Sequence, residues 1–117
     1  MEKTILDKAK ELLADPDIII DLYDFTIVWS SQKHEKITGF SKKELTGKQV
    51  QNFFALNGDK KRAKAIEHMS KSHGRMNVES TTKKGYVVKF TVEFYTIKFD
   101  DGFYHIGKLL DYKKIPK

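Results

Sequence analysis

The sequence contains no cysteine among its 117 residues. Disulfides, thiolate metal ligands and cysteine nucleophiles are therefore excluded, and a reducing compartment is compatible with the chain. It also lacks any run near the roughly 18 consecutive apolar residues that a membrane-spanning helix needs. Charges interrupt the apolar positions of its N-terminus, so no signal peptide is expected. These absences predict a cytoplasmic protein that has no membrane partner.

Histidine is scarce, and no two histidines have the H-x-H or H-E-x-x-H spacing of a metal site, so none is expected. The four are His34, His68, His73 and His105. Catalysis would require a nucleophile with a base, or two carboxylates in a cleft. Asp21 and Glu79 qualify by residue type alone, and most other acidic residues fit caps, turns or partners of lysines. We therefore predict no catalytic residues and no enzymatic activity.

The residues that are present suffice for one compact domain. Apolar residues make up 39% of the chain and aromatic residues 12%, enough for a core at this length. The formal charge of +6 could attract nucleic acid. However, the densest basic stretch, residues 59–71, interleaves lysines with apolar residues, as the solvated face of an amphipathic helix does. A basic nucleic-acid-binding protein is kept as an alternative, and nucleic acid is not the expected partner.

The first segment, residues 1–15, is predicted to be an amphipathic helix. Thr4 and Asp7 have the spacing of a capping box, and Pro16 prevents the helix from continuing. Its apolar residues recur at helical spacing, which indicates a face that needs a cover or a partner. The residues that we expect at a homodimer interface are Ile5, Leu6, Leu12 and Leu13.

The segment from Asp17 to Ser31 predicts two short neighbouring strands, because it is rich in β-branched and aromatic residues and is broken only at "YDFT". The next residues, 31–38, predict no independent helix, only a helical turn that Gly39 ends. Ser41 and Glu44 then form a second capping box, so we expect a short helix that Gly47 ends.

Two further helices are predicted before the chain changes character. One is a short piece anchored by Phe53 and Phe54, and the other is a longer helix that Asp59 caps and that His73 and Gly74 close.

From Arg75 onward the apolar period is two, which predicts three long antiparallel strands with turns at "KKG" and "DDG". The middle strand has Val88, Phe90 and Val92 in one phase, but Tyr95 and Ile97 in the other. This change predicts either a β-bulge near Phe94 and Tyr95, or a sheet whose outer face is covered at one end by the first helix.

These patterns together resemble the PAS, or sensory box, family. The stretch "IIIDLYDFTIVWSS" (residues 18–31) is followed by "TGFSKKELTGK" (residues 38–48), as in the family. Gly74, Glu79, Gly85 and the pair Asp101 and Gly102 stand where the family has a closing glycine, a strand glutamate and two hairpin turns. The resemblance covers Asp17 to Tyr112. One departure is Ser31 in place of the usual asparagine, which is expected to weaken the cap of the following turn.

The resemblance implies an α+β fold, with a five-stranded antiparallel sheet, short helices on one face and an N-terminal amphipathic helix. The PAS domain is expected over residues 16–113, with a C-terminal tail over residues 114–117. The implied function is a sensory module of a signal transduction protein, such as a two-component system, that binds a small molecule or a protein partner and transmits the change. The implied partners are a second copy of the chain and an effector such as a histidine kinase or a transcription regulator.

PAS-like domains commonly hold small molecules between the sheet and the helices, which gives candidate pocket residues. They are Trp29, His34, Phe53, Ile66, Met69, Phe90 and Val92. A flavin adduct is excluded without cysteine, whereas a noncovalent flavin remains an alternative because aromatic residues could enclose its ring. Haem is disfavoured because His68 is five residues from the position that carries the ligand in haem-binding relatives, a rotation of about 140° around a helix. We expect no bound cofactor, and the sequence leaves the ligand unidentified.

Overall fold

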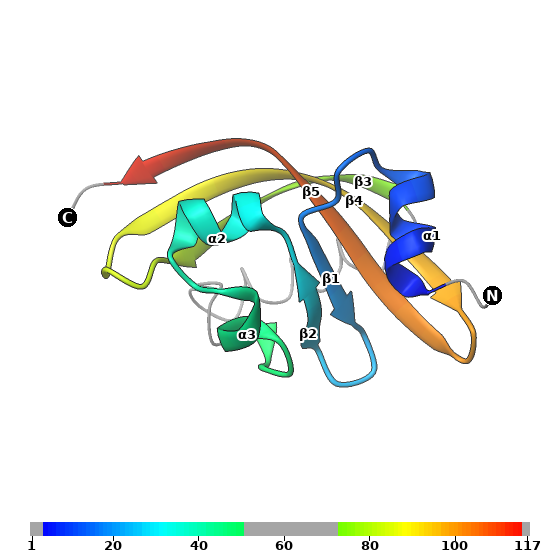
Figure 1. Cartoon of the computed structure of the whole chain (residues 1–117). Helices are drawn as coiled ribbons and strands as arrows, with labels where there is room; N and C mark the ends of the chain where they lie inside the picture. The colour runs from blue at the N-terminus through cyan, green and yellow to red at the C-terminus, as the bar shows by residue number, and fades with distance from the viewer. Residues whose placement is uncertain (1–3, 51–72, 116–117) are drawn as a thin grey trace.

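The computed structural model describes residues 4–50 and 73–115, and its strands form one antiparallel sheet in the order β2-β1-β5-β4-β3 (Figure 1). The expected α+β fold with a five-stranded sheet is confirmed. The elements in chain order are α1 (Ile5–Leu12), β1 (Ile18–Asp21), β2 (Thr26–Ser30), α2 (Gln32–Thr38), α3 (Lys42–Leu45), β3 (His73–Thr81), β4 (Val87–Phe99) and β5 (Gly102–Ile115).

The helices lie on both faces of the sheet. We call the face that carries Phe90 the inner face, because Ile37 of α2 packs beside Phe90 and Leu45 of α3 packs on the inward residues of β1. The opposite, outer face is covered by α1, whose Ala9 packs with Ile19 of β1. Residues of β1 therefore alternate between the two faces, as a strand buried on both sides requires.

Helix α1 begins at the predicted capping box but ends at Leu12, earlier than the predicted limit at Pro16. The Thr4 hydroxyl accepts a hydrogen bond from the Asp7 N–H at 3.1 Å, and the Asp7 carboxylate accepts one from the Thr4 N–H at 3.0 Å. The helix stops at Leu12, before Pro16, which cannot continue it.

The apolar residues of β4 change phase because α1 covers one end of the outer face of the sheet, which is the second of the two predicted causes. Val88, Phe90, Val92 and Phe94 are buried, whereas Tyr95 and Ile97 pack against the α1 cluster on the outer face. A β-bulge does occur, but the register of β4 and β5 shifts between Thr91 and Val92 rather than near Phe94 and Tyr95. The alternative placement of a bulge at Phe94 is therefore wrong, and cover by α1 explains the pattern.

The predicted close of a helix at His73 and Gly74 is also wrong. Both residues belong to β3, where they pair with Tyr95 and Phe94 of β4. A Cβ on Gly74 would lie 3.3 Å from Cζ of Phe94, so the glycine makes room for that ring instead of ending a helix. The helices predicted between Phe53 and Lys71 lie outside the described residues.

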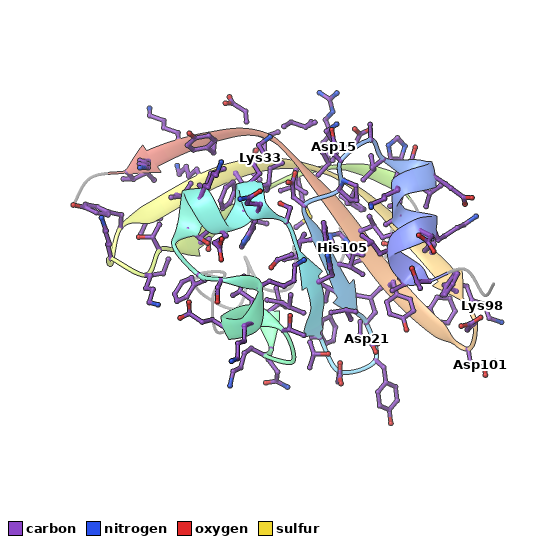
Figure 2. All side chains as sticks on the ribbon, viewed as in Figure 1. Asp15, Asp21, Lys33, Lys98, Asp101 and His105 are labelled. Atoms are coloured by element: carbon purple, nitrogen blue, oxygen red, sulfur yellow. The ribbon has the colours of Figure 1, made fainter. Side chains whose placement is uncertain are left out.

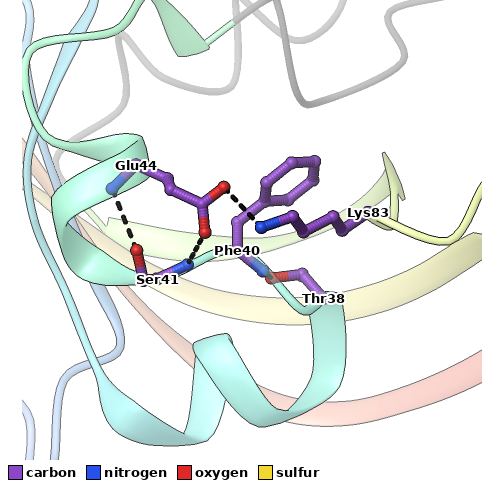
Figure 3. Close-up of polar contacts among 5 residues, drawn as sticks. All are labelled: Thr38, Phe40, Ser41, Glu44 and Lys83. Atoms are coloured by element: carbon purple, nitrogen blue, oxygen red, sulfur yellow. Dashed lines mark hydrogen bonds and ion pairs between the residues drawn. The ribbon is translucent and has the colours of Figure 1, made fainter.

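Helix α3 begins at the predicted capping box, which also binds the β3–β4 hairpin (Figure 3). The Ser41 hydroxyl accepts from the Glu44 N–H, and the Glu44 carboxylate accepts from the Ser41 N–H, both at 3.1 Å. The second Glu44 oxygen lies 2.8 Å from Nζ of Lys83 in the hairpin. A local helix signal thus also fixes the position of a distant turn.

Strand β5 continues two residues into the segment predicted as a tail, because Lys114 and Ile115 pair with Val88 and Val87. Within residues 4–50 and 73–115, no helix has the length and apolar character needed to cross a bilayer.

Candidate functional site

Three of the predicted pocket residues meet on the inner face. The ring of His34, on α2, stacks on the ring of Phe90, on β4, with centroids 6.1 Å apart and planes 20° apart. Val92 follows Phe90 on the same face of β4 and belongs to the same buried cluster. His34 is 0% exposed and Phe90 is 1% exposed, so atoms of the chain itself cover this wall.

Trp29 lies elsewhere, on the outer face beside the α1 cluster, with Nζ of Lys42 located 5.0 Å from its ring centroid. Regular alternation from the inward Ile27 would have turned Trp29 inward. The register of β1 and β2 shifts, so that Ile20 pairs with Ile27 but Ile19 pairs with Trp29. The bulge therefore reverses the side on which Trp29 projects, and the structure does not bring Trp29 together with Phe90.

The remaining predicted pocket residues, Phe53, Ile66 and Met69, lie outside the described residues, as does His68. Asp21 and Glu79 are on β1 and β3, which β5 and β4 separate. Asp21 accepts a hydrogen bond from the Tyr23 N–H in its own turn, and Glu79 faces Lys89 at 4.0 Å. These two carboxylates form no pair.

A residue that the sequence analysis did not single out, Asp17, connects the sheet to α2. Asp17 is 3% exposed. One carboxylate oxygen accepts from the Ser31 hydroxyl at 2.6 Å, and the other accepts from the Leu109 N–H of β5 at 2.7 Å. Hydrogen bonds to a carboxylate are stronger than those between neutral groups. Asp17 therefore holds the start of α2 against β5.

Ser31 continues this connection into α2, because its hydroxyl also accepts from the His34 N–H at 3.1 Å. The expectation that serine would weaken this cap is therefore wrong. Serine is among the favoured N-cap residues, and its hydroxyl donates to Asp17 while it accepts from the helix. Residues 32–38 accordingly form a helix rather than a turn.

A lysine joins the same two elements from the other side. Nζ of Lys33, on α2, donates to the carbonyl oxygen of Leu109 at 3.0 Å (Figure 2). The two backbone polar groups of Leu109 are thus bound by side chains that connect to α2, one directly and one through Ser31.

Burial sets the charge of two histidines on the inner face. Removal from water lowers the pKa of His34 to about 4, although the nearby negative charge of Asp17 acts in the opposite direction. Burial likewise lowers the pKa of His105 on β5 to about 4, and this ring lies 5.0 Å from the ring of Phe94. Both imidazoles are therefore neutral at pH 7.

Two polar atoms of the inner face are buried and, within the described ranges, have no hydrogen-bond partner: Oγ of Ser30 and Nδ1 of His105. Their strand partners, Ile18 and Ile20, belong to the cluster under α3. These atoms could engage a ligand that carries a donor or an acceptor. Residues 4–50 and 73–115 contain no group of side chains suited to a metal ion.

The residues predicted for a dimer interface contact the protein's own sheet. Leu13 is buried, and Ile5, Leu6 and Leu12 are partly buried against Ile19 and Ile106. The apolar face of α1 is therefore largely used within one chain.

Comparison with solved structures gives similar folds at low sequence identity. The PAS domain of an HTR-like protein from Haloarcula marismortui has a TM-score of 0.63 and 15% identity, over 91% of each chain. The LOV domain of a blue-light-activated histidine kinase from Erythrobacter litoralis has a TM-score of 0.58 and 16% identity, over 84% of this chain and 97% of that one. A light-oxygen-voltage domain studied with a flavin analogue has a TM-score of 0.62 and 17% identity, over 93% of this chain and 87% of that one.

A comparison of the sequence with curated proteins gives no match. The profile of the PAS domain family matches residues 16–107, which include β1 to β4 and the first part of β5. Sequence profile, strand order and fold agree, and the chain belongs to the PAS domain family.

Proposed function

We propose that this PAS domain is a non-enzymatic sensory module whose input site is the inner-face wall formed by His34, Phe90 and Val92. The fold is that of sensory PAS and LOV domains. The observation that supports this site is the chain of hydrogen bonds from the His34 N–H through Ser31 and Asp17 to β5. A change at the wall would therefore move a residue that is bonded to the strand leaving the domain.

The ligand class follows from the character of the wall. Its faces are aromatic and aliphatic, and the neutral imidazole of His34 has both a donor and an acceptor nitrogen. A small, uncharged aromatic molecule fits this combination better than an anion does, because none of the three described residues that form the wall carries a positive charge at pH 7. Since Phe90 and His34 are almost fully covered, such a molecule would enter only by displacing side chains that pack on them. That displacement is the signal, and it can be no larger than the ligand's preference for the opened state.

A noncovalent flavin is the second candidate, favoured by the likeness to a light-oxygen-voltage domain studied with a flavin analogue. When bound, a flavin supplies light-driven or redox chemistry. In this chain Phe90 and His34 would stack on its ring, and Ser30 and His105 would offer hydrogen bonds. Against it, the wall is closed by the chain's own side chains, and the sequence has no cysteine for an adduct.

Native mass spectrometry of protein isolated without denaturation tests the proposal and separates the two candidates. We expect a protein complex with one small molecule, or binding of indole as an aromatic probe, that His34→Ala weakens. His73→Ala, on the exposed end of β3, is the matched control. A flavin would add its visible absorption bands. If untreated protein carries no molecule and indole causes no amide shifts at Phe90 or Val92, the input site is not here.

The other properties expected from the sequence remain predictions. They are a cytoplasmic location, a homodimer, and an effector such as a histidine kinase or a transcription regulator.

A further inference from the structure

Strand β5 extends well beyond the strand beside it. It has 14 residues, but β1 pairs with it only between Tyr104 and Gly107. Beyond this point, among the strands that the structure describes, β5 pairs with β4 alone (Figure 1). An unpaired strand edge offers backbone donors and acceptors to another chain.

Side chains satisfy the first part of this edge. The Leu109 N–H is bonded to Asp17 and its carbonyl to Lys33. Past Leu109, residues 110–114 are all exposed, and within the described residues no strand or helix is bonded to their β1 side. The free edge therefore begins where the side chains from α2 and Asp17 stop.

The bulge in β5 determines which backbone groups point outward. The Phe103 and Gly107 carbonyls and the Leu109 N–H are directed toward β1. Because Thr91 pairs with Asp111 but Val92 pairs with Leu109, Leu110 is an extra residue in β5, and beyond it the even-numbered residues direct their backbone groups away from β4. The Tyr112 N–H is bonded to the carboxylate of its own neighbour, Asp111, at 2.8 Å rather than to the β4 ladder. Because alternate residues of an antiparallel strand face the same edge, Tyr112 and Lys114 present their N–H and C=O groups outward.

The side chains along the edge are apolar and basic. Leu110 is 37% exposed and Tyr112 is 46% exposed, which is unusual for large apolar residues in succession on a strand. Lys113 and Lys114 are exposed beside them, and Lys33 reaches the same edge from α2. Asp111 is the only acidic residue of the stretch, so lysines outnumber acidic groups here.

We propose that the free edge of β5, residues 110–114, is a docking site for an extended acidic segment of a partner protein, which adds a sixth strand to the sheet. Backbone bonds to Tyr112 and Lys114 give the affinity, and carboxylates opposite the lysines select the sequence. A partner strand would take the Tyr112 N–H from Asp111. Docking at this edge does not require that a small molecule bind at the inner-face wall.

The charge of the edge argues against a second copy of the chain as the occupant. Two copies of β5 would each bring an edge with more lysine than acid, and antiparallel pairing about Lys113 would place the two Lys113 side chains opposite each other, which is destabilising. An acidic strand has the opposite effect. The excess of lysine on this edge thus disfavours self-pairing relative to pairing with an acidic strand.

Two fluorescein-labelled peptides of ten residues test the proposal, one alternating valine with glutamate and one alternating valine with lysine. We expect the acidic peptide to bind in low salt and the basic peptide to bind at least about tenfold more weakly. The paired change K113E and K114E should weaken acidic-peptide binding about tenfold. Lys98→Glu, at the far end of β4 (Figure 2), is the matched control and should change binding less than about twofold.

The change Lys114→Pro removes one outward N–H without removing a bond to β4, and proline is tolerated on strand edges. Compared with Lys114→Ala, which removes the same charge and keeps the N–H, it should weaken binding about fivefold, the loss of one backbone hydrogen bond. In amide exchange, Tyr112 and Lys114 should gain protection when the acidic peptide is added. The proposal is overturned if both peptides bind equally or if neither binds. It is also overturned if the protected amides lie on β3, or if the protein dimerises through this edge.

Discussion

Acid should destabilise this domain through its two buried histidines. The pKa of His34 and of His105 falls from the usual 6.5 to about 4 in the folded protein. Between these values the unfolded chain binds more protons than the folded chain does, so the stability that the neutral rings contribute is complete above pH 6.5 and is lost as the pH falls toward 4. A difference of about 2.5 pH units at about 1.4 kcal/mol per unit corresponds to about 3 to 4 kcal/mol for each imidazole, of which about 3 kcal/mol is lost by pH 4.

The change His34→Phe isolates one of these contributions. A phenyl ring keeps the stacking on Phe90 but cannot be protonated, so the loss of unfolding free energy between pH 7 and pH 4 should shrink by about 3 kcal/mol. His105→Phe should act similarly, and the double variant should remove most of the difference. Urea unfolding at several pH values, followed by the fluorescence of the single tryptophan, Trp29, measures this. If wild type and both variants lose the same stability in acid, the buried neutral histidines are not its cause.

Three further experiments test other contacts within the fold. Asp17→Ala should reduce the unfolding free energy by about 3 kcal/mol, because it leaves the buried Leu109 N–H without its acceptor. Asp15→Asn, at an exposed position, should change the unfolding free energy by under about 0.5 kcal/mol. Urea unfolding measures both values, and equal effects would refute the role of Asp17. Gly107→Ala places a Cβ 3.0 Å from the side chains of Ile18 and Val92 on the inner face, so it should lower the unfolding free energy by about 1–3 kcal/mol. Thermal melting measures this loss, and an unchanged melting temperature would contradict tight packing at this position. Ser41→Ala should lower the unfolding free energy by about 1 kcal/mol, because it removes the cap of α3. Lys83→Met should lower the unfolding free energy by less, because the ion pair of Lys83 with Glu44 is exposed. Thermal melts that show the larger loss for Lys83→Met would contradict this ranking.

Local chemistry explains why much of the fold could be predicted from the sequence. Both capping boxes act within three residues, so Thr4 and Ser41 mark the starts of α1 and α3. The "DDG" turn and the period of two in β4 likewise depend on neighbouring residues. The switch of phase at Tyr95 predicts a covered outer face, and the amphipathic pattern of the first helix predicts which element covers it.

The features that escaped prediction depend on residues far apart in the sequence. Asp17 is 14 residues from Ser31 and 92 from Leu109, and no local pattern relates them. Regular alternation predicts an inward Trp29, because it gives no sign of the bulge at Val28 in the same strand, where three residues of β2 oppose two of β1. Gly74 was read as the end of a helix, although its small size serves the ring of Phe94. In each case tertiary contacts override the local signal.

In our proposal the inner-face wall is coupled to β5 through Ser31 and Asp17. Amide NMR spectra of His34→Phe, recorded with Ser31 intact and in a Ser31→Ala background, test it directly. Ser31→Ala removes the hydroxyl's bonds to the Asp17 carboxylate and the His34 N–H, but keeps the Leu109 bond and the 2.9 Å backbone bond from the Ser31 N–H to the Asp17 carbonyl. We predict that His34→Phe shifts the Leu109 amide, and that the shift drops by about half or more without the serine hydroxyl, the remainder passing through Lys33 and this backbone bond. An equal shift in both backgrounds, or none in either, would contradict the coupling.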